Sequence, residues 1–132
     1  MLHRFECRVY YDEVDFGGIV YYANYLKYIE RARTEYVRDL GVDQTVLKDQ
    51  GLVFAVKKLD ADYLRPAKFD DVIRVETGLS AVTGARFFME QNIWRKDEHL
   101  FACAVTIVCL TDLGKPARIP AEIRRKLQKN CA

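Results

Sequence analysis

One segment, residues 22–40, does most to limit how this chain can fold. Its apolar side chains recur at intervals of three and four residues, which is the spacing of an α-helix that buries one face. Gly41 follows directly, and glycine is common just past a helix end because it adopts the left-handed conformation easily. The segment is the longest stretch with this period. The sequence therefore predicts one long helix whose apolar face must find its core against strands.

The other apolar stretches alternate with polar residues or are rich in β-branched and aromatic residues, which indicates strands. The predicted strands cover residues 5–14, 52–63, 72–81, 86–96 and 100–110. The turns between the later strands are Arg65-Pro66-Ala67 with Asp70-Asp71, Thr83-Gly84, and Lys96-Asp97-Glu98. Consecutive strands joined by tight turns run antiparallel. Two short helices are predicted at residues 43–50 and 121–128.

This order of elements predicts an α+β fold in a single domain, residues 1–132. We expect a curved, antiparallel, five-stranded sheet that wraps around the long helix. Such strands expose more apolar surface than one helix can cover. We therefore also expect a homo-oligomer, either a dimer or a tetramer of two dimers.

Composition excludes several classes of function. Half of the residues are hydrophobic and 30% are charged, with 21 basic against 19 acidic side chains. A net charge of +2 is too small for a dedicated nucleic-acid binder, whose affinity comes from neutralising many phosphates. No apolar stretch is long enough to span a bilayer, and the charged N-terminal residues do not resemble a signal peptide. We expect a cytoplasmic protein without nucleic-acid partners or transmembrane segments.

The four cysteines give no sign of a metal or disulfide site. Cys7, Cys103, Cys109 and Cys131 include no closely spaced pair, and only two histidines accompany them. We expect reduced thiols that fill strands and no bound metal.

The chemically informative residues lie between the first strand and the long helix, in residues 10–25. Asp15 precedes the pair Gly17-Gly18, which lets the backbone turn tightly, and the helix begins a few residues later. The first turn of a helix presents backbone amides without internal partners at a positive dipole end. A carbonyl held there would be polarised while Asp15 attacks it or orients a water. This combination suits the hydrolysis of an activated acyl group.

Residues 9–36, VYYDEVDFGGIVYYANYLKYIERARTEY, resemble the hotdog-fold acyl-CoA thioesterases of the 4-hydroxybenzoyl-CoA thioesterase and Tol-Pal-associated type. The resemblance implies the hotdog fold for nearly the whole chain. It also implies that Asp15 is catalytic and that the backbone amide of Tyr22 holds the thioester carbonyl. In that family, active sites lie between subunits, often in tetramers.

Two positions depart from the family's pattern. The Tol-Pal-associated branch has a histidine where this chain has Tyr22, so a histidine side chain cannot act there. The 4-hydroxybenzoyl-CoA branch has a basic cluster in the hairpin that matches residues 82–86, where only Arg86 is basic here. Contacts to coenzyme A therefore cannot be copied from that branch.

These observations predict hydrolysis of an acyl- or aroyl-CoA thioester to the free acid and coenzyme A. Asp15 is the predicted general base or nucleophile, and the Tyr22 amide is the predicted oxyanion donor. The leaving thiol has a pKa of about 8.5, so it leaves readily as thiolate without a strong general acid. No cofactor is implied. The predicted substrate-binding residues are Gly18, Tyr21, Asn24, Tyr25, Arg65 and Arg86.

Other interpretations stay open from the sequence. Asp15 also suits a turn or a helix cap, and Asp12 with Glu13 is a weak candidate for a metal cluster. A hotdog dehydratase or hydratase would need a histidine near the helix, whereas His3 and His99 lie outside the motif. A non-catalytic module that binds acyl-CoA or acyl carrier protein is a further alternative. The acyl group itself is not determined.

Overall fold

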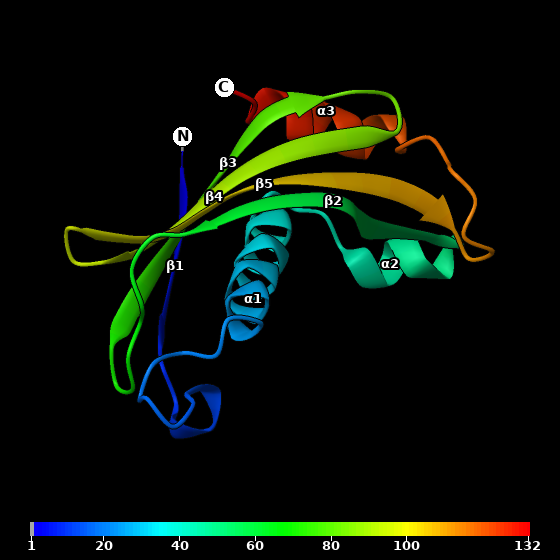
Figure 1. The fold of residues 1–132 in the computed structure, drawn as a ribbon. Helices are drawn as coiled ribbons and strands as arrows, with labels where there is room; N and C mark the ends of the chain where they lie inside the picture. Colours follow the sequence, from blue (N-terminus) through cyan, green and yellow to red (C-terminus); the bar gives the residue numbers. More distant parts are fainter. Residues whose placement is uncertain (1) are drawn as a thin grey trace.

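A computed structural model describes residues 2–132 of the chain. A five-stranded antiparallel sheet curves around one long helix, α1 (Asn24–Asp39), as Figure 1 shows. The strands are β1 (His3–Arg8), β2 (Leu52–Tyr63), β3 (Val72–Val82), β4 (Arg86–Arg95) and β5 (Glu98–Thr111). Two shorter helices, α2 (Gln44–Asp49) and α3 (Ala121–Lys129), and a short 3₁₀ helix, η1 (Tyr11–Glu13), complete the chain. The predicted α+β architecture is confirmed.

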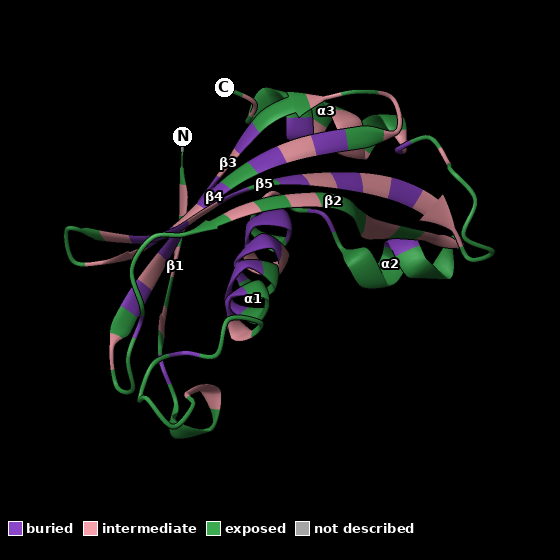
Figure 2. Cartoon of the chain, in the orientation of Figure 1, coloured by how far each residue is buried: buried purple, intermediate pink, exposed green. Residues whose placement is uncertain are grey.

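The core lies between α1 and the concave face of the sheet. Tyr28, Ile29 and Ala32 are almost fully buried on the helix, at the spacing that the sequence predicted. On β3 and β4 buried and less buried residues alternate, so that one face of each strand packs against the helix. Figure 2 shows the buried face of α1 turned toward the strands. Because this face of α1 is buried against the sheet, the first turn of the helix has a defined position relative to the loops at that end of the sheet.

The predicted strand at residues 5–14 is too long. Strand β1 ends at Arg8, and residues 9–14 leave the sheet through η1. The Glu13 carboxylate accepts a 2.7 Å hydrogen bond from the Tyr10 amide, which closes this turn and removes the amide from any strand ladder. Helix α1 begins at Asn24 instead of residue 22. The Asn24 amide donates to the carbonyl of Tyr21, so residues 21–24 form a turn that precedes the helix.

The predicted tight turn between β2 and β3 is also wrong. The strand order is β1-β3-β4-β5-β2, so β2 pairs with β5 and lies at the opposite edge of the sheet from β1 and β3. The segment 64–71 is therefore a crossover loop that passes from one edge toward the other. Turn residues mark a change of direction but do not say which strand is the next neighbour. The β3–β4 and β4–β5 connections are hairpins, as predicted.

Two further expectations concern the whole chain. Within residues 2–132, no helix is long and apolar enough to cross a membrane. All four cysteines are free thiols, with Cys103 and Cys109 buried in β5. Burial raises the pKa of the Cys103 thiol to about 11, despite the opposing effect of the nearby Arg33.

Candidate active site

Asp15 sits at the tip of a short hairpin between β1 and α1. Val14 pairs with Val20 in an antiparallel bridge, and the Asp15 carbonyl accepts a 3.0 Å hydrogen bond from Gly18. Gly18 has a φ of 75°, a conformation that side chains disfavour, so glycine is required there. Figure 1 shows this connection as blue coil near the start of α1. The glycine pair thus produces the tight turn that the sequence indicated.

One oxygen of the Asp15 carboxylate is fixed and the other is open. Oδ1 accepts a 2.9 Å hydrogen bond from the amide of Gly17. Oδ2 forms no hydrogen bond with any residue in the described range 2–132. The turn-capping role considered from the sequence is therefore real, and it is compatible with chemistry because it uses a single oxygen.

The Asp15 carboxylate borders a hollow of about 580 Å³ that is open to solvent. Phe16 is fully exposed, and the rings of Tyr11 and Phe69 meet edge to face at 5.4 Å between centroids. The residues that line the hollow are Tyr11, Val14, Asp15, Phe16, Gly18 and Phe69. The lining is mostly aromatic and apolar, which suits contact with an apolar group more than with a hydrated ion.

The start of α1 leaves an amide available near this turn. The Tyr21 amide donates a 3.0 Å hydrogen bond to the Glu13 carbonyl, and the Asn24 amide donates a 2.8 Å hydrogen bond to the Tyr21 carbonyl. The Tyr22 amide forms no hydrogen bond with the described residues, and its side chain is 62% exposed. Unpaired amides at a helix start attract negative charge. The connection between β1 and α1 therefore carries both an open carboxylate oxygen, on Asp15, and an unpaired backbone amide, on Tyr22.

Glu13 organises this region, a role that the sequence did not predict. Besides the Tyr10 amide, its carboxylate accepts a 2.9 Å hydrogen bond from the Tyr28 hydroxyl and lies 3.6 Å from Arg31. Burial and the Glu13 contact raise the pKa of Tyr28. The three-residue spacing of Tyr10 and Glu13 was the only available signal, and the partner on α1 depends on tertiary packing.

The metal cluster that Asp12 and Glu13 offered as an alternative does not form in residues 2–132. No three His, Cys, Asp or Glu side chains of this range are arranged to hold a metal ion. The Glu13 carboxylate is instead occupied by the contacts described above.

The aromatic and amide residues predicted to bind substrate have different surroundings. Tyr21 is half exposed and its ring lies 4.9 Å from that of Tyr22. The Asn24 side chain donates to the carbonyl of Glu13 at 2.9 Å, so it holds the loop to the helix. Tyr25 is 3% exposed, and its hydroxyl accepts the Ala67 amide at 2.9 Å. Burial raises its pKa, so the phenol stays neutral.

The two arginines predicted to bind substrate, Arg65 and Arg86, lie at opposite ends of the sheet. Arg65 is exposed on the crossover loop, 3.8 Å from Glu98, at the same end as the Asp15 turn. Arg86 begins β4, at the far end of β3 from that loop. A strand as long as β3 spans roughly 35 Å. One chain therefore does not bring Arg86 and Asp15 together.

Comparison with known proteins finds relatives over nearly the whole chain. Residues 9–127 match the model of the thioesterase-like superfamily. The chain is 46% identical to an acyl-CoA thioesterase, YbgC, of Haemophilus influenzae over 91% of its length and 90% of that protein. It is 36% identical to an acyl-CoA thioester hydrolase, YbgC, of Escherichia coli, with 92% of both chains covered.

Solved structures show the same fold. A probable thioesterase from Bartonella henselae superimposes with a TM-score of 0.86 at 39% identity, covering 91% of this chain and all of that one. A gentisyl-coenzyme A thioesterase matches with a TM-score of 0.87 at 21% identity, covering 94% of this chain and 98% of that one. These relationships confirm the predicted hotdog fold, and the chain belongs to the thioesterase-like superfamily.

Proposed function

We propose that this protein hydrolyses acyl-CoA thioesters to a carboxylic acid and coenzyme A, with Asp15 and the Tyr22 amide as its reacting pair. One observation carries the proposal: an open carboxylate oxygen on Asp15 lies in the same hairpin-to-helix unit as an unpaired amide on Tyr22. Relatives with the names acyl-CoA thioesterase and acyl-CoA thioester hydrolase support the substrate class.

The oxyanion donor is held rigidly from both sides. The Tyr21 amide donates to Glu13 O, and the carbonyl of Tyr22 accepts a 2.9 Å hydrogen bond from the Tyr63 hydroxyl. The Tyr22 N–H lies between these two anchors. A donor fixed before reaction stabilises developing charge without a cost of reorganisation. The helix dipole of α1 adds to this effect.

Asp15 acts on the carbonyl carbon either directly or through water. The Gly17 contact keeps one oxygen in place, so the other presents its lone pairs in a defined direction. Direct attack would form an anhydride with Asp15, which water then opens, and the base route would activate water in one step. Both routes release coenzyme A as a thiolate, which needs no strong acid.

A pair of subunits completes the site in this proposal. The outer edge of β2 has no strand partner within the described residues, and Val53 and Val56 are partly exposed there. Open edges favour pairing with another strand. Antiparallel pairing of two β2 edges about a two-fold axis would bring the Arg86 end of one sheet toward the Asp15 end of the other. Arg86 of the partner subunit would then approach the bound nucleotide.

A groove at the Arg86 end supports this role. It has a volume of about 310 Å³, and Arg86 and Lys57 both line it. Two basic side chains facing one groove suit a phosphate better than either would alone. In this proposal Asp15 and the Tyr22 amide of one subunit act on the thioester, and the groove with Arg86 and Lys57 on the other subunit contacts the nucleotide. The protein would work in the cytoplasm, where acyl-CoA is found.

The test is a thiol-release assay with acetyl-, hexanoyl- and benzoyl-CoA, using wild-type protein and Asp15→Asn. Release by the wild-type protein alone supports the proposal. Binding of acyl-CoA without release would favour a binding module, and consumption of an enoyl-CoA without thiol release would favour a hydratase.

Sedimentation measures the mass of the active species, and an active monomer would contradict a site shared between subunits.

A further inference from the structure

We propose that Arg95, at the end of β4, is a positioning residue for the reaction. It holds the crossover loop, residues 64–71, and this loop in turn supports the Asp15 hairpin. The inference rests on the proposed function, because it assigns Arg95 an effect on turnover through Asp15. Arg95 itself touches none of the reacting groups.

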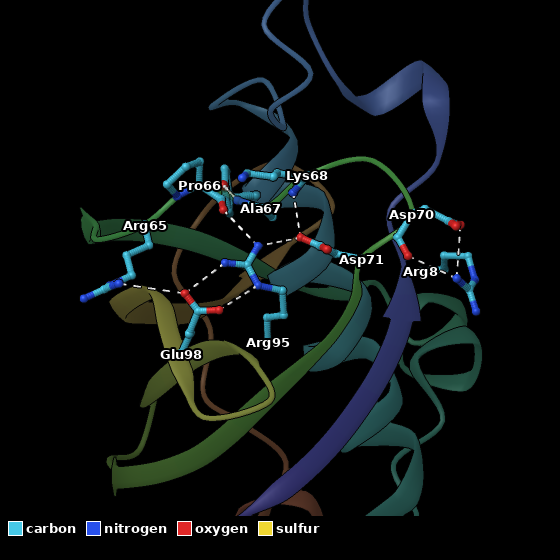
Figure 3. A network of polar contacts seen from close by, with 10 residues as sticks. Arg8, Arg65, Pro66, Ala67, Lys68, Asp70, Asp71, Arg95 and Glu98 are labelled. Carbon is cyan, nitrogen blue, oxygen red and sulfur yellow. Dashed lines mark hydrogen bonds and ion pairs between the residues drawn. The ribbon is translucent and has the colours of Figure 1, made fainter.

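The Arg95 guanidinium binds the loop near both of its ends. Nη1 donates to the Asp71 carboxylate at 2.6 Å and to the Pro66 carbonyl at 3.2 Å. On its other side, Nε donates to the Glu98 carboxylate at 3.2 Å. Figure 3 shows the guanidinium between these partners. The donors of the planar guanidinium lie on separate nitrogens and reach acceptors on two sides, whereas the three donors of a lysine share one nitrogen.

This ion pair is shielded enough to matter. The side chains of Arg95 and Asp71 are 19% and 20% exposed, whereas most ion pairs of this chain have a widely exposed member. Exposed pairs contribute little, and shielded pairs with additional hydrogen bonds contribute more. The contacts with Glu98 and Asp71 raise the pKa of Arg95, so it stays charged at any pH of an assay.

The loop needs such support because its backbone is strained. Asp70 has a φ of 72°, an uncommon conformation for a residue with a side chain. The Asp71 carboxylate also accepts the Lys68 amide at 2.8 Å, which closes the loop on itself. Arg8 adds an exposed contact to Asp70 on the other side, visible in Figure 3. Loss of Arg95 leaves the strained segment with fewer restraints.

The crossover loop supports the Asp15 hairpin through backbone hydrogen bonds. The Val20 amide donates to Ala67 O at 2.8 Å, and Ile19 pairs with Lys68 in an antiparallel bridge. Thus the arm of the hairpin that follows Asp15 is hydrogen-bonded to the loop.

The same loop also contacts the long helix. The Ala67 amide donates to the hydroxyl of Tyr25 in the first turn of α1. Ala67 is therefore bonded both to the hairpin that carries Asp15 and to the helix start that carries the Tyr22 amide. A shift of the loop would change the separation of the reacting groups, and a displacement of about 1 Å can cost up to about 10² in rate.

Arg95→Met tests this role, with Arg38→Met as the matched control. Arg38 also forms a 2.6 Å pair, with Glu35, but on the exposed surface of α1 and without contact to the loop. We expect Arg95→Met to lower kcat about tenfold with KM changed less than twofold, and Arg38→Met to leave both unchanged. Arg95→Lys should give an intermediate kcat, and it serves if the methionine variant does not fold.

A double-mutant cycle separates positioning from a general loss of stability. If Arg95 acts through Asp15, Arg95→Met should cost less than twofold in the Asp15→Asn background. Hydrogen exchange at the Val20 amide should be faster in Arg95→Met, while the global unfolding transition stays above the assay temperature. An equal loss in both backgrounds, or wild-type kcat in Arg95→Met, would overturn the inference.

The same measurements distinguish this inference from the proposed function. If Asp15→Asn kept full turnover, the proposed function would fail. Exchange at Val20 would still report whether Arg95 holds the loop, because that readout does not depend on catalysis.

Discussion

The hydroxyl of Tyr63 donates a 2.9 Å hydrogen bond to the carbonyl oxygen of Tyr22. This contact joins the last residue of edge strand β2 to the segment that precedes α1. Tyr63 also packs edge to face against Tyr25, with 5.3 Å between ring centroids. The strand that we expect to meet a second subunit is therefore hydrogen-bonded to the residue whose amide we propose as oxyanion donor. We therefore expect pairing of the subunits to affect the position of the Tyr22 amide through the Tyr63 hydroxyl.

Replacing Tyr63 by phenylalanine tests this coupling. The ring contacts remain and only the hydrogen bond to Tyr22 O is lost, so the fold should survive. We expect kcat to fall about three- to tenfold, since an imperfectly oriented donor stabilises the oxyanion less well. Steady-state thiol release measures the effect, and Tyr36→Phe is the control because the buried Tyr36 hydroxyl has no hydrogen-bond partner within the described residues. Equal kcat values in the two variants would contradict the coupling.

Asp15→Asn should lower kcat by about 10² to 10⁴, the contribution of a positioned acid or base. The amide oxygen of asparagine can still accept the Gly17 hydrogen bond, so the turn and the thermal unfolding midpoint should change little. A single turnover in ¹⁸O-labelled water then tests the nucleophilic route. Label in the Asp15 side chain of the wild-type protein indicates an anhydride that water opens at the Asp15 carbon, and therefore a nucleophile.

Tyr22→Phe should keep kcat within a few-fold, because the proposed donor is the backbone amide and the phenol is exposed. Tyr22→Pro removes the donor and should lose about 10² or more. Circular dichroism must show that the proline variant is folded. A folded phenylalanine variant as inactive as Asp15→Asn would mean that the hydroxyl itself takes part in the reaction.

Arg86→Ala should raise KM for acyl-CoA more than KM for the matching acyl-pantetheine, which lacks the nucleotide, and leave kcat nearly unchanged. If the site is shared between subunits, mixing Arg86→Ala with Asp15→Asn protein should restore some sites with normal KM. Each hybrid dimer then has one site that combines Asp15 of the first variant with Arg86 of the second. Equal KM changes for both substrates would show that Arg86 meets no phosphate.

Stability should fall between pH 9 and pH 11. The pKa of Cys103 is raised to about 11 in the folded chain, whereas a free thiol ionises near 9.0. In this window the folded chain retains a proton that the unfolded chain has lost, so rising pH favours unfolding. Urea titrations of the wild-type protein and Cys103→Ala should show a weaker pH dependence for the alanine variant. Identical slopes would contradict the assignment.

The sequence predicted the elements that depend on local pattern and missed those that depend on distant partners. The helical period located α1, and alternation located β2 to within a residue. The end of β1 was misplaced because residues 9–14 keep a strand-like composition while Glu13 binds their backbone. The position of β2 at the sheet edge followed from pairing with β5, which no local signal encodes.

The candidate site was predicted unevenly for the same reason. Asp15 and the glycine pair are contiguous, so their turn was visible in the sequence. Tyr25 was expected near substrate because of its place in the motif, yet its hydroxyl is occupied by Ala67, forty-two residues away. Arg95 could not be recognised at all, since its partners Pro66 and Asp71 belong to a loop that looked like a hairpin turn.

The strand order also has a consequence for how the chain folds. Strands β3, β4 and β5 form a meander of near neighbours, whereas β1 and β2 join its two edges through contacts such as His3 with Thr77 and Leu52 with Thr111. Closing long loops is slow, so the meander should form early and both edges late. The Asp15 hairpin depends on elements from both edges. Regain of thiol release during refolding should therefore lag behind regain of β-sheet circular dichroism, so that activity marks the last step of folding.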